Sequence, residues 1–248
     1  MAGHSKWSNI KRRKGAVDAK RGKIFTKLVR EITTAARLGG GDPAGNPRLR
    51  AAIAAAKSQA MPADNITRAI KKGTGEHDGP PVEECFYEGY GPGGIALYIE
   101  AQTDNRNRTS AEIRAAFNKY NGNLGAPGSV AWMFNKCGLF AFDASKYGEE
   151  EIMDAALNAG ADDVVKEDDV INVTCNPKDF ADVLEHFDSL HLKYDLAELT
   201  MVADNNTDIK GRDAETLLKL LDKLEDLDDV QKVHANFDLD NDELDRLS

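Results

Sequence analysis

Apolar residues recur at helical spacing in the first third of the chain, where they predict three short helices. In residues 23–38 one face is apolar and the opposite face carries Lys and Arg, as in a helix packed on one side. Glycines at 39–41 end this helix, and an Asn-Pro pair at 46–47 opens an Ala-rich second helix, because asparagine caps helices and proline suits the first turn. A Met-Pro break at 61–62 separates it from a third helix that ends near Lys72.

Beyond a Gly- and Pro-rich linker at residues 73–81, the apolar pattern changes mainly to the period of strands. The predicted order of elements is ββα, then ββαββαβ, then αβ. The expected elements are strands at 82–90 and 95–103, a helix at 106–120, a hairpin at 130–143, a helix at 149–159, strands at 163–166 and 170–175, a helix at 177–190, a strand at 195–203, a helix at 213–226 and a strand at 230–237, before an acidic, solvated C-terminal end.

This order predicts an α+β protein, because a sheet and amphipathic helices bury their apolar faces against one another as a two-layer sandwich. The first ββα block needs another helix and strand to complete its layer, so we expect the middle block to be inserted in it. The predicted domains are a basic tail at 1–22, a helical domain at 23–79, an α/β domain formed by 80–129 plus 205–248, and an inserted α/β domain at 130–204.

Bulk composition narrows the class of protein. The 248 residues contain no apolar run of the roughly eighteen residues that a membrane span needs, and the N-terminus lacks the apolar core of a secretory signal. Cys85, Cys137 and Cys175 are an odd number at wide spacing, which offers no disulfide framework. We therefore expect reduced thiols, no membrane partner and a cytoplasmic location.

Charge is strongly segregated along the chain. Residues 1–72 contain 17 Lys and Arg against 4 Asp and Glu, a balance of +13, although the whole chain carries −10. The remaining residues therefore carry −23. Binding of a polyanion responds to the potential within about 10 Å, so the acidic overall balance does not exclude a nucleic-acid partner.

The cations of the first third are the candidate contacts with nucleic acid. Phosphate backbones bind such arrays because condensed counterions are released, and Trp7 is placed among them to stack on an unpaired base. The alternative is a solvated tail with ordinary charged helix faces, which explains less well why the cations are concentrated in an otherwise acidic chain. The candidate residues are Lys6, Trp7, Lys11, Arg12, Arg13, Lys14, Lys20, Arg21, Lys23, Lys27, Arg30, Arg37, Arg68, Lys71 and Lys72.

Other motifs indicate no catalytic, metal or cofactor site. Gly89, Gly91 and Gly94 match G-x-G-x-x-G, but a strand follows them where a dinucleotide site needs a helix, so we interpret them as a tight hairpin. The five histidines lack metal-ligand spacing, and the acidic run at 238–242 lacks the glycine of a calcium loop. We expect no enzyme, no cofactor and no small-molecule substrate.

Five motifs together resemble the YebC/PmpR family, which includes the mitochondrial translational activator of cytochrome oxidase subunit one. They are AGHSKWSNIKRRK with the following KIFTKLVREI, then MPADNITRAIKKGTG, YEGYGPGG and NGNLGAPGSVAWMF, in the expected order from residue 2 onward. The resemblance implies an N-terminal helical domain and two ferredoxin-like α/β domains, one inserted in the other. It also implies a cytoplasmic, non-catalytic regulator of gene expression.

Two main hypotheses of function follow, and a third is distant. The first is a DNA-binding transcriptional regulator that also uses Arg48, Arg50 and Lys57, although no helix-turn-helix with base-reading side chains is evident. The second is a factor bound to ribosomal RNA, because a cationic tail and glycine-rich loop tips suit irregular RNA. The resemblance implies that such a factor assists synthesis through proline-rich stretches. The third is an enzyme that uses a cleft between the α/β domains.

Overall fold

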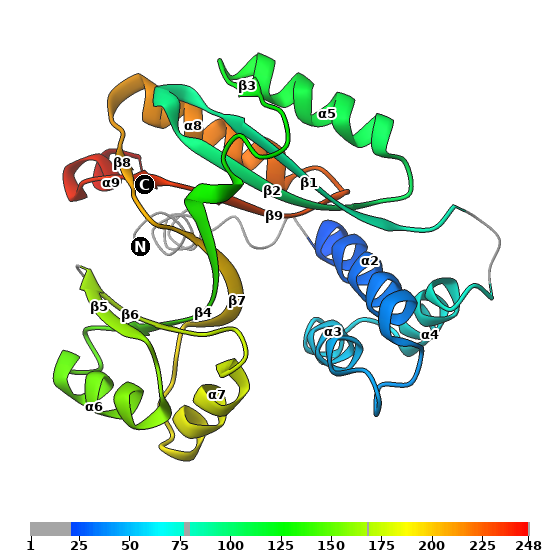
Figure 1. Cartoon of the computed structure of the whole chain (residues 1–248), viewed down its shortest axis with the longest axis horizontal. Coiled ribbons are helices and arrows are strands. Elements are labelled where there is room, and N and C mark those ends of the chain that lie inside the picture. Colours follow the sequence, from blue (N-terminus) through cyan, green and yellow to red (C-terminus); the bar gives the residue numbers. More distant parts are fainter. Residues whose placement is uncertain (1–20, 77–79, 168, 248) are drawn as a thin grey trace. The chain divides into compact units, whose positions relative to one another are not determined.

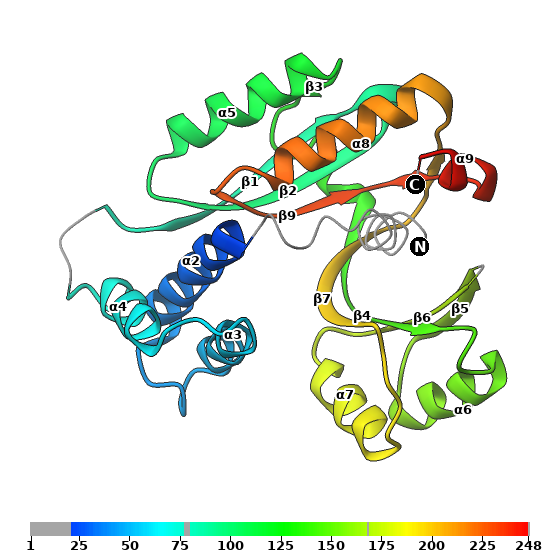
Figure 2. The ribbon, with the colours of Figure 1, turned by 180° about the vertical axis from the view of Figure 1, so that it is seen from behind.

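The computed structural model describes residues 21–76, 80–167 and 169–247, which form two compact units (Figures 1 and 2). The larger unit comprises the described residues up to 131, together with 209–235 and 239–247. The smaller unit comprises 132–208 and 236–238. Helices and antiparallel sheets are mixed in both, so the predicted α+β class is confirmed.

Three helices begin the larger unit: α2 (Arg21–Gly39), α3 (Pro47–Ser58) and α4 (Ala63–Gly73). Small side chains such as Ala36 and Ala56 let them approach one another closely around Ile32 and Leu49. The predicted cap is confirmed, since Asn46 accepts a hydrogen bond from the Leu49 backbone and donates one to the Ala35 carbonyl. These three helices agree with the sequence prediction to within a few residues.

A four-stranded antiparallel sheet follows in the order β3-β1-β2-β9. Its strands are β1 (Glu83–Tyr90), β2 (Ala96–Thr103), the short β3 (Asn123–Leu124) and β9 (Val230–Ala235). The β1–β2 hairpin, closed by the one-turn helix η2 (Pro92–Gly94), occupies the centre. Helices α5 (Arg106–Lys119) and α8 (Gly211–Glu225) lie on one face of this sheet (Figures 1 and 2).

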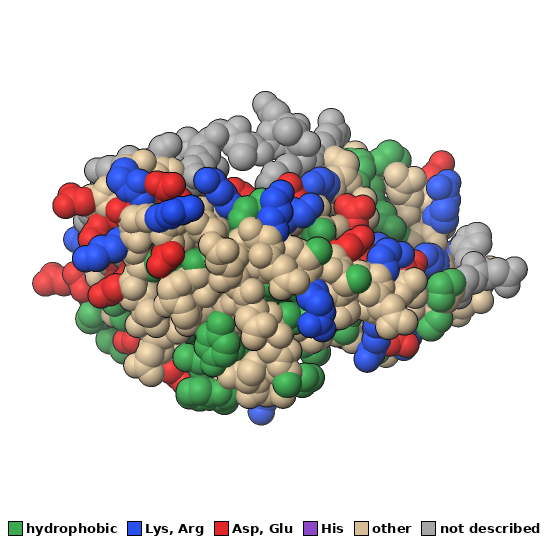
Figure 3. Space-filling model, turned by 90° about the horizontal axis from the view of Figure 1, so that it is seen from above, with side chains coloured by type: hydrophobic (Ala, Val, Ile, Leu, Met, Phe, Trp, Pro, Cys, Tyr) green, Lys and Arg blue, Asp and Glu red, His purple; other side chains and the backbone are tan. Residues whose placement is uncertain are grey.

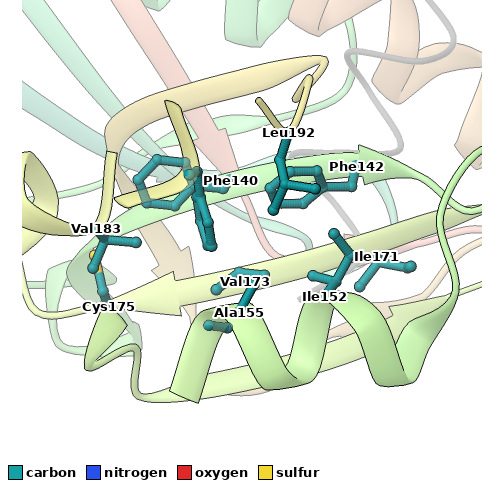
Figure 4. Packing of buried hydrophobic residues seen from close by; sticks show 11 residues of the cluster. Phe140, Phe142, Ile152, Ala155, Ile171, Val173, Cys175, Val183 and Leu192 are labelled. Carbon is teal, nitrogen blue, oxygen red and sulfur yellow. The ribbon is translucent and has the colours of Figure 1, made fainter. Parts of the chain in front are cut away.

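The smaller unit contains a second sheet, with strand order β5-β6-β4-β7. Its chain order is β4 (Phe134–Asp143), α6 (Glu149–Ala159), β5 (Asp163–Glu167), β6 (Val170–Cys175), α7 (Phe180–Ser189) and β7 (Leu196–Ala203). This βαββαβ order with antiparallel pairing is the ferredoxin-like arrangement. Phe140 and Phe142 lie in its core with Ile152 and Val173 (Figure 4), and both rings pack edge-on against Phe187.

The predicted hairpin at 130–143 is wrong. Residues 131–133 form the short turn η3 (Ala131–Met133), and β4 continues as one strand between β6 and β7. A β-carbon at Gly138 would lie 2.6 Å from the Cys175 sulfur and 2.7 Å from the Phe180 ring. The glycine therefore permits close packing in the middle of a strand.

The C-terminal end also differs from the solvated segment expected. Two short strands, β8 (Thr207–Asp208) and β10 (Phe237–Asp238), pair in parallel, and the helix α9 (Asn241–Leu247) follows. Leu239 is buried, and Arg246 forms ion pairs with Glu215 and Glu243. The ion pair between Arg246 and Glu215 of α8 holds α9 on the larger unit, which acidic composition alone did not predict.

One buried carboxylate joins four segments of the larger unit. Asp229, which is 2% exposed, lies between α8 and β9 and accepts hydrogen bonds from Thr103 of β2 and from Thr109 and Arg108 of α5. Arg30 of α2 completes the set with an ion pair of 2.5 Å. Burial disfavours the charge, but the hydrogen bonds and both cations outweigh it and lower the pKa of Asp229.

Asp229→Asn is expected to destabilise the larger unit by about 3 kcal/mol, because removing one partner of a buried ion pair leaves the other charge uncompensated. Equilibrium urea unfolding measures this change. Asp104→Asn is the matched control, since Asp104 contacts Arg108 from a more exposed position and its loss is expected to cost about 1 kcal/mol or less. Equal losses in the two variants would show that burial of the pair is not the cause.

The stabilisation from Asp229 is expected to depend on pH. Its folded pKa lies below the unfolded value of about 3.9, so the contribution is present above that value and is lost as the pH falls through the folded pKa. The difference in unfolding free energy between the wild type and Asp229→Asn should be constant above about pH 5 and shrink below about pH 4. Urea titrations from neutral to acidic pH check this, and a difference that does not change with pH would contradict it.

Candidate nucleic-acid interface

The exposed face of α4 carries three cations at helical spacing. Arg68, Lys71 and Lys72 lie at i, i+3 and i+4 and are exposed, whereas Ile66 and Ala69 on the opposite face are buried. Among the described residues, no carboxylate lies within ion-pair distance of these three side chains. They are therefore available to a polyanion from solution.

The cations of α2 are placed differently. Lys23 forms an ion pair of 3.1 Å with Asp226, and Arg30 is bound to Asp229 with only 16% of its side chain exposed. Lys27 is half-buried, and Arg37 donates a hydrogen bond to the Val82 carbonyl. The expectation that these residues form one solvent-facing stripe is wrong for Arg30, because its charge is used inside the larger unit.

Two cations of α3 also have partners within the protein. Arg48 bonds Glu31 of α2 and Glu84 of β1, each at 2.7 Å, and hydrogen bonds from Arg48 to Glu31 raise the pKa of its guanidinium. Arg50 donates to the carbonyl of Pro43 in the preceding turn. Lys57, by contrast, is exposed. Sequence alone ranked these three residues equally, and the structure separates them by their partners.

The remaining candidate residues fall in the N-terminal tail. Arg21 is the first residue of α2. The rest lie outside the described residues, so their proposed role stays a prediction; they are Lys6, Trp7, Lys11, Arg12, Arg13, Lys14 and Lys20.

A pocket of about 250 Å³ lies at the C-terminal ends of α2 and α4 and brings Arg37 and Lys72 together. A β-carbon at Gly73 would lie 2.4 Å from the Thr33 carbonyl oxygen, so the glycine allows the two helices to meet there. Both cations complement the partial negative charge of helix C-termini. The two cations therefore stabilise the helix ends. They also place two positive charges next to the exposed face of α4.

The tips of the two glycine-rich turns are exposed, but each turn is fixed by contacts within the larger unit. The first is the predicted tight hairpin, in which Gly93 has φ of 70° and an added β-carbon would lie 2.9 Å from the Ile209 side chain. The second, at 121–131, is fixed by Glu88 of β1. The Glu88 carboxylate is 6% exposed and accepts backbone hydrogen bonds from Gly128, Val130 and Ala131 at 2.6–2.7 Å. Burial opposes ionisation, but these three donors lower the pKa of Glu88.

The described residues also bear on metal ligation, on thiol reactivity and on membrane spanning. They include no group of three or more His, Cys, Asp or Glu that is placed to hold a metal ion. Burial raises the pKa of Cys137 and of Cys175 to about 11, so these thiols stay protonated at neutral pH. No helix among the described residues has the length and apolar character that crossing a membrane requires.

The sequence analysis missed two structural carboxylates: Glu88, which fixes the turn at 121–131, and Asp229, which binds Arg30. Glu88 lies within β1 on the same face as Phe86 and Tyr90, and Asp229 lies in the connection between α8 and β9; both carboxylates are buried. Glu88 had a usable signal, since it lies between glycines and aromatic residues within a strand. Asp229 had none, because its partners come from segments up to 199 positions away in the chain.

Basic and acidic side chains are interspersed over the face of the molecule in Figure 3, which has no continuous area of one sign. Arg68, Lys71 and Lys72, which face solvent with no acidic partner among the described residues, form a local cluster on α4. A local cluster of this kind suits contact with a few phosphates rather than wrapping of a long duplex.

Comparison with known proteins gives consistent family assignments over almost the whole chain. Residues 5–76 match the TACO1/YebC protein N-terminal domain, and residues 82–237 match the TACO1/YebC second and third domain. Proteins described as "probable transcriptional regulatory protein" from Trichlorobacter lovleyi and Geobacter sulfurreducens are 54% and 53% identical over 247 residues, covering 100% of both chains.

A solved structure supports the fold. The crystal structure of a conserved hypothetical protein from Aquifex aeolicus, Aq1575, superposes with a TM-score of 0.80 at 46% identity, covering 91% of this chain and 93% of that one. Together with the matched domains and the full-length relatives, this similarity shows that the chain belongs to the TACO1/YebC family.

Proposed function

We propose that the protein regulates gene expression by binding nucleic acid, in the first place DNA, through the cation-rich first third of its chain. The observation that carries this proposal is the solvent-facing triad Arg68, Lys71 and Lys72, in a segment whose balance is +13 within a chain of −10. The relatives named as probable transcriptional regulatory proteins support regulation of transcription. A cytoplasmic location belongs to the same proposal.

The smaller unit makes an unsuitable surface for phosphates. Residues 132–208 contain 5 Lys and no Arg against 18 Asp and Glu. Such an excess of carboxylates repels a polyanion at close range and discourages nonspecific coating of nucleic acid. Contact through the N-terminal helices therefore accounts best for the segregation of charge.

The position of the cations on α4 bears on specificity. A recognition helix reads bases mainly with its N-terminal residues, but Ala63, Asp64 and Asn65 open α4, and its cations lie toward the other end. Contacts from that end are to phosphates, which position a protein on its ligand without reading sequence. This geometry favours a second candidate function, in which the ligand is structured RNA of the ribosome.

The test is the salt dependence of binding in a variant that neutralises α4, Arg68→Gln/Lys71→Gln/Lys72→Gln. Each lost phosphate contact is expected to reduce the slope of log affinity against log salt by about 0.9 on duplex DNA, so the triple variant loses up to about 2.7. Fluorescence anisotropy between about 50 and 200 mM salt measures the slope on a labelled duplex and on a ribosomal RNA fragment.

The matched control is Lys166→Gln/Lys178→Gln/Lys193→Gln, which removes the same charge from the acidic smaller unit. Its slope should equal that of the wild type. If both triple variants weaken binding equally, the effect reflects net charge and the assignment to α4 is wrong. Tighter binding to the duplex supports transcription as the process, whereas tighter binding to ribosomal RNA supports the second candidate.

A further inference from the structure

Helices cover one face of the first sheet, and the other face carries aromatic side chains. Residues facing α5 and α8, such as Leu97 and Ile99, are buried. The opposite face presents the alternate positions of β1, which include Phe86 and Tyr90, and those of β2, which include Tyr98. Phe86 is 53% exposed and Tyr90 is 38% exposed.

Three of these rings form a row across three strands. The rings of Phe86 and Tyr98 are stacked, with centroids 5.7 Å apart and planes inclined by 18°. Tyr98 lies 6.2 Å from His234 of β9, which is directly opposite it in the strand register. Phe86 ends this row and is the most exposed member, so its ring is held by a neighbour while half of its surface faces solvent.

The carboxylates on this face already have partners. Glu84 is paired with Arg48, Glu88 is satisfied by three backbone donors, and Glu100 lies 2.9 Å from a ring nitrogen of His234. These three carboxylates are thus partly neutralised by partners within the protein, which reduces their repulsion of a ligand phosphate. The surface left for a ligand is the exposed half of the Phe86 ring, because Ala96 and His234 on the same face are buried.

We propose that Phe86, supported by Tyr98, is a stacking site for an unpaired base of single-stranded nucleic acid. A base is flat, uncharged and close in size to the exposed ring, and stacking on an aromatic side chain tolerates any base. Sheets whose open face carries aromatic residues bind unpaired bases in this way, whereas bases within a duplex are already stacked on one another. The inference deepens the proposed function, on which it rests, by specifying an unpaired strand.

A stacked base and a bound phosphate leave different signatures. Phosphate contacts release counterions and so contribute to the salt slope, but stacking releases none. Removing Phe86 should therefore weaken binding by a constant factor at every salt concentration. Neutralising the cations of α4 should instead weaken binding mainly at low salt.

The experiment compares the wild type, Phe86→Ala and Phe86→Trp in binding a fluorescein-labelled 12-nucleotide RNA and a duplex of the same sequence. Phe86→Ala is expected to weaken single-strand binding by about 5- to 100-fold, with an unchanged salt slope and less than about a twofold change on the duplex. Phe86→Trp should retain wild-type affinity because it restores the ring. Leu38→Ala is the matched control, since Leu38 is a comparably exposed apolar residue on α2.

The outcomes separate the two proposals. If the wild type binds the RNA with a steep salt slope but Phe86→Ala binds equally well, stacking is overturned and the proposed function stands. If Phe86→Ala weakens both ligands equally, selection of an unpaired strand is overturned. If the wild type binds neither ligand at low salt, the proposed function itself fails. Thermal unfolding of each variant shows whether the fold is retained.

Discussion

The ionised, buried carboxylate of Asp229 is the constraint on which the arrangement of the larger unit depends. A charge that is 2% exposed is tolerated only because α2, β2 and α5 each supply a donor to it. The ion pair between Arg30 and Asp229 determines which face of α2 packs against the sheet. It also commits Arg30 to a structural role, so this cation of α2 is not presented to a ligand. A single internal interaction thus determines part of the charge presented outside.

The elements were largely predictable because each is a local consequence of apolar spacing and helix or turn chemistry. The helix predicted at 149–159 begins at Glu149 and ends at Ala159, where Gly160 adopts φ of 79°. The predictions failed where a residue serves a contact with a part of the chain that is distant in sequence. Gly138 lies within the predicted hairpin at 130–143, yet the glycine is required by the close approach of Cys175 from a neighbouring strand. The sequence contains the glycine but not the identity of the atom that approaches it.

For the candidate site as well, local features were predictable from the sequence and long-range contacts were not. Composition predicted that cations concentrate in the first third, and no distant information was needed for that. It did not distinguish Arg30 from Arg68, since both are arginines on amphipathic helices, and only the fold places Asp229 beside one of them. The aromatic row was harder still, because Phe86, Tyr98 and His234 are separated in sequence and meet through strand register. Pairing of strands is a long-range choice that periodicity does not specify.

The segregated charge and the aromatic face contribute to the recognition of a nucleic acid in different ways. Phosphate contacts supply affinity for any nucleic acid, DNA or RNA, and cannot by themselves decide which one a regulator occupies. Stacking adds affinity only where bases are unpaired, and the acidic smaller unit adds repulsion wherever a long polyanion would extend across it. A ligand that satisfies all three conditions is short, locally single-stranded and flanked by phosphates that reach α4. Loops of folded RNA and locally opened DNA meet this description, whereas an uninterrupted duplex does not.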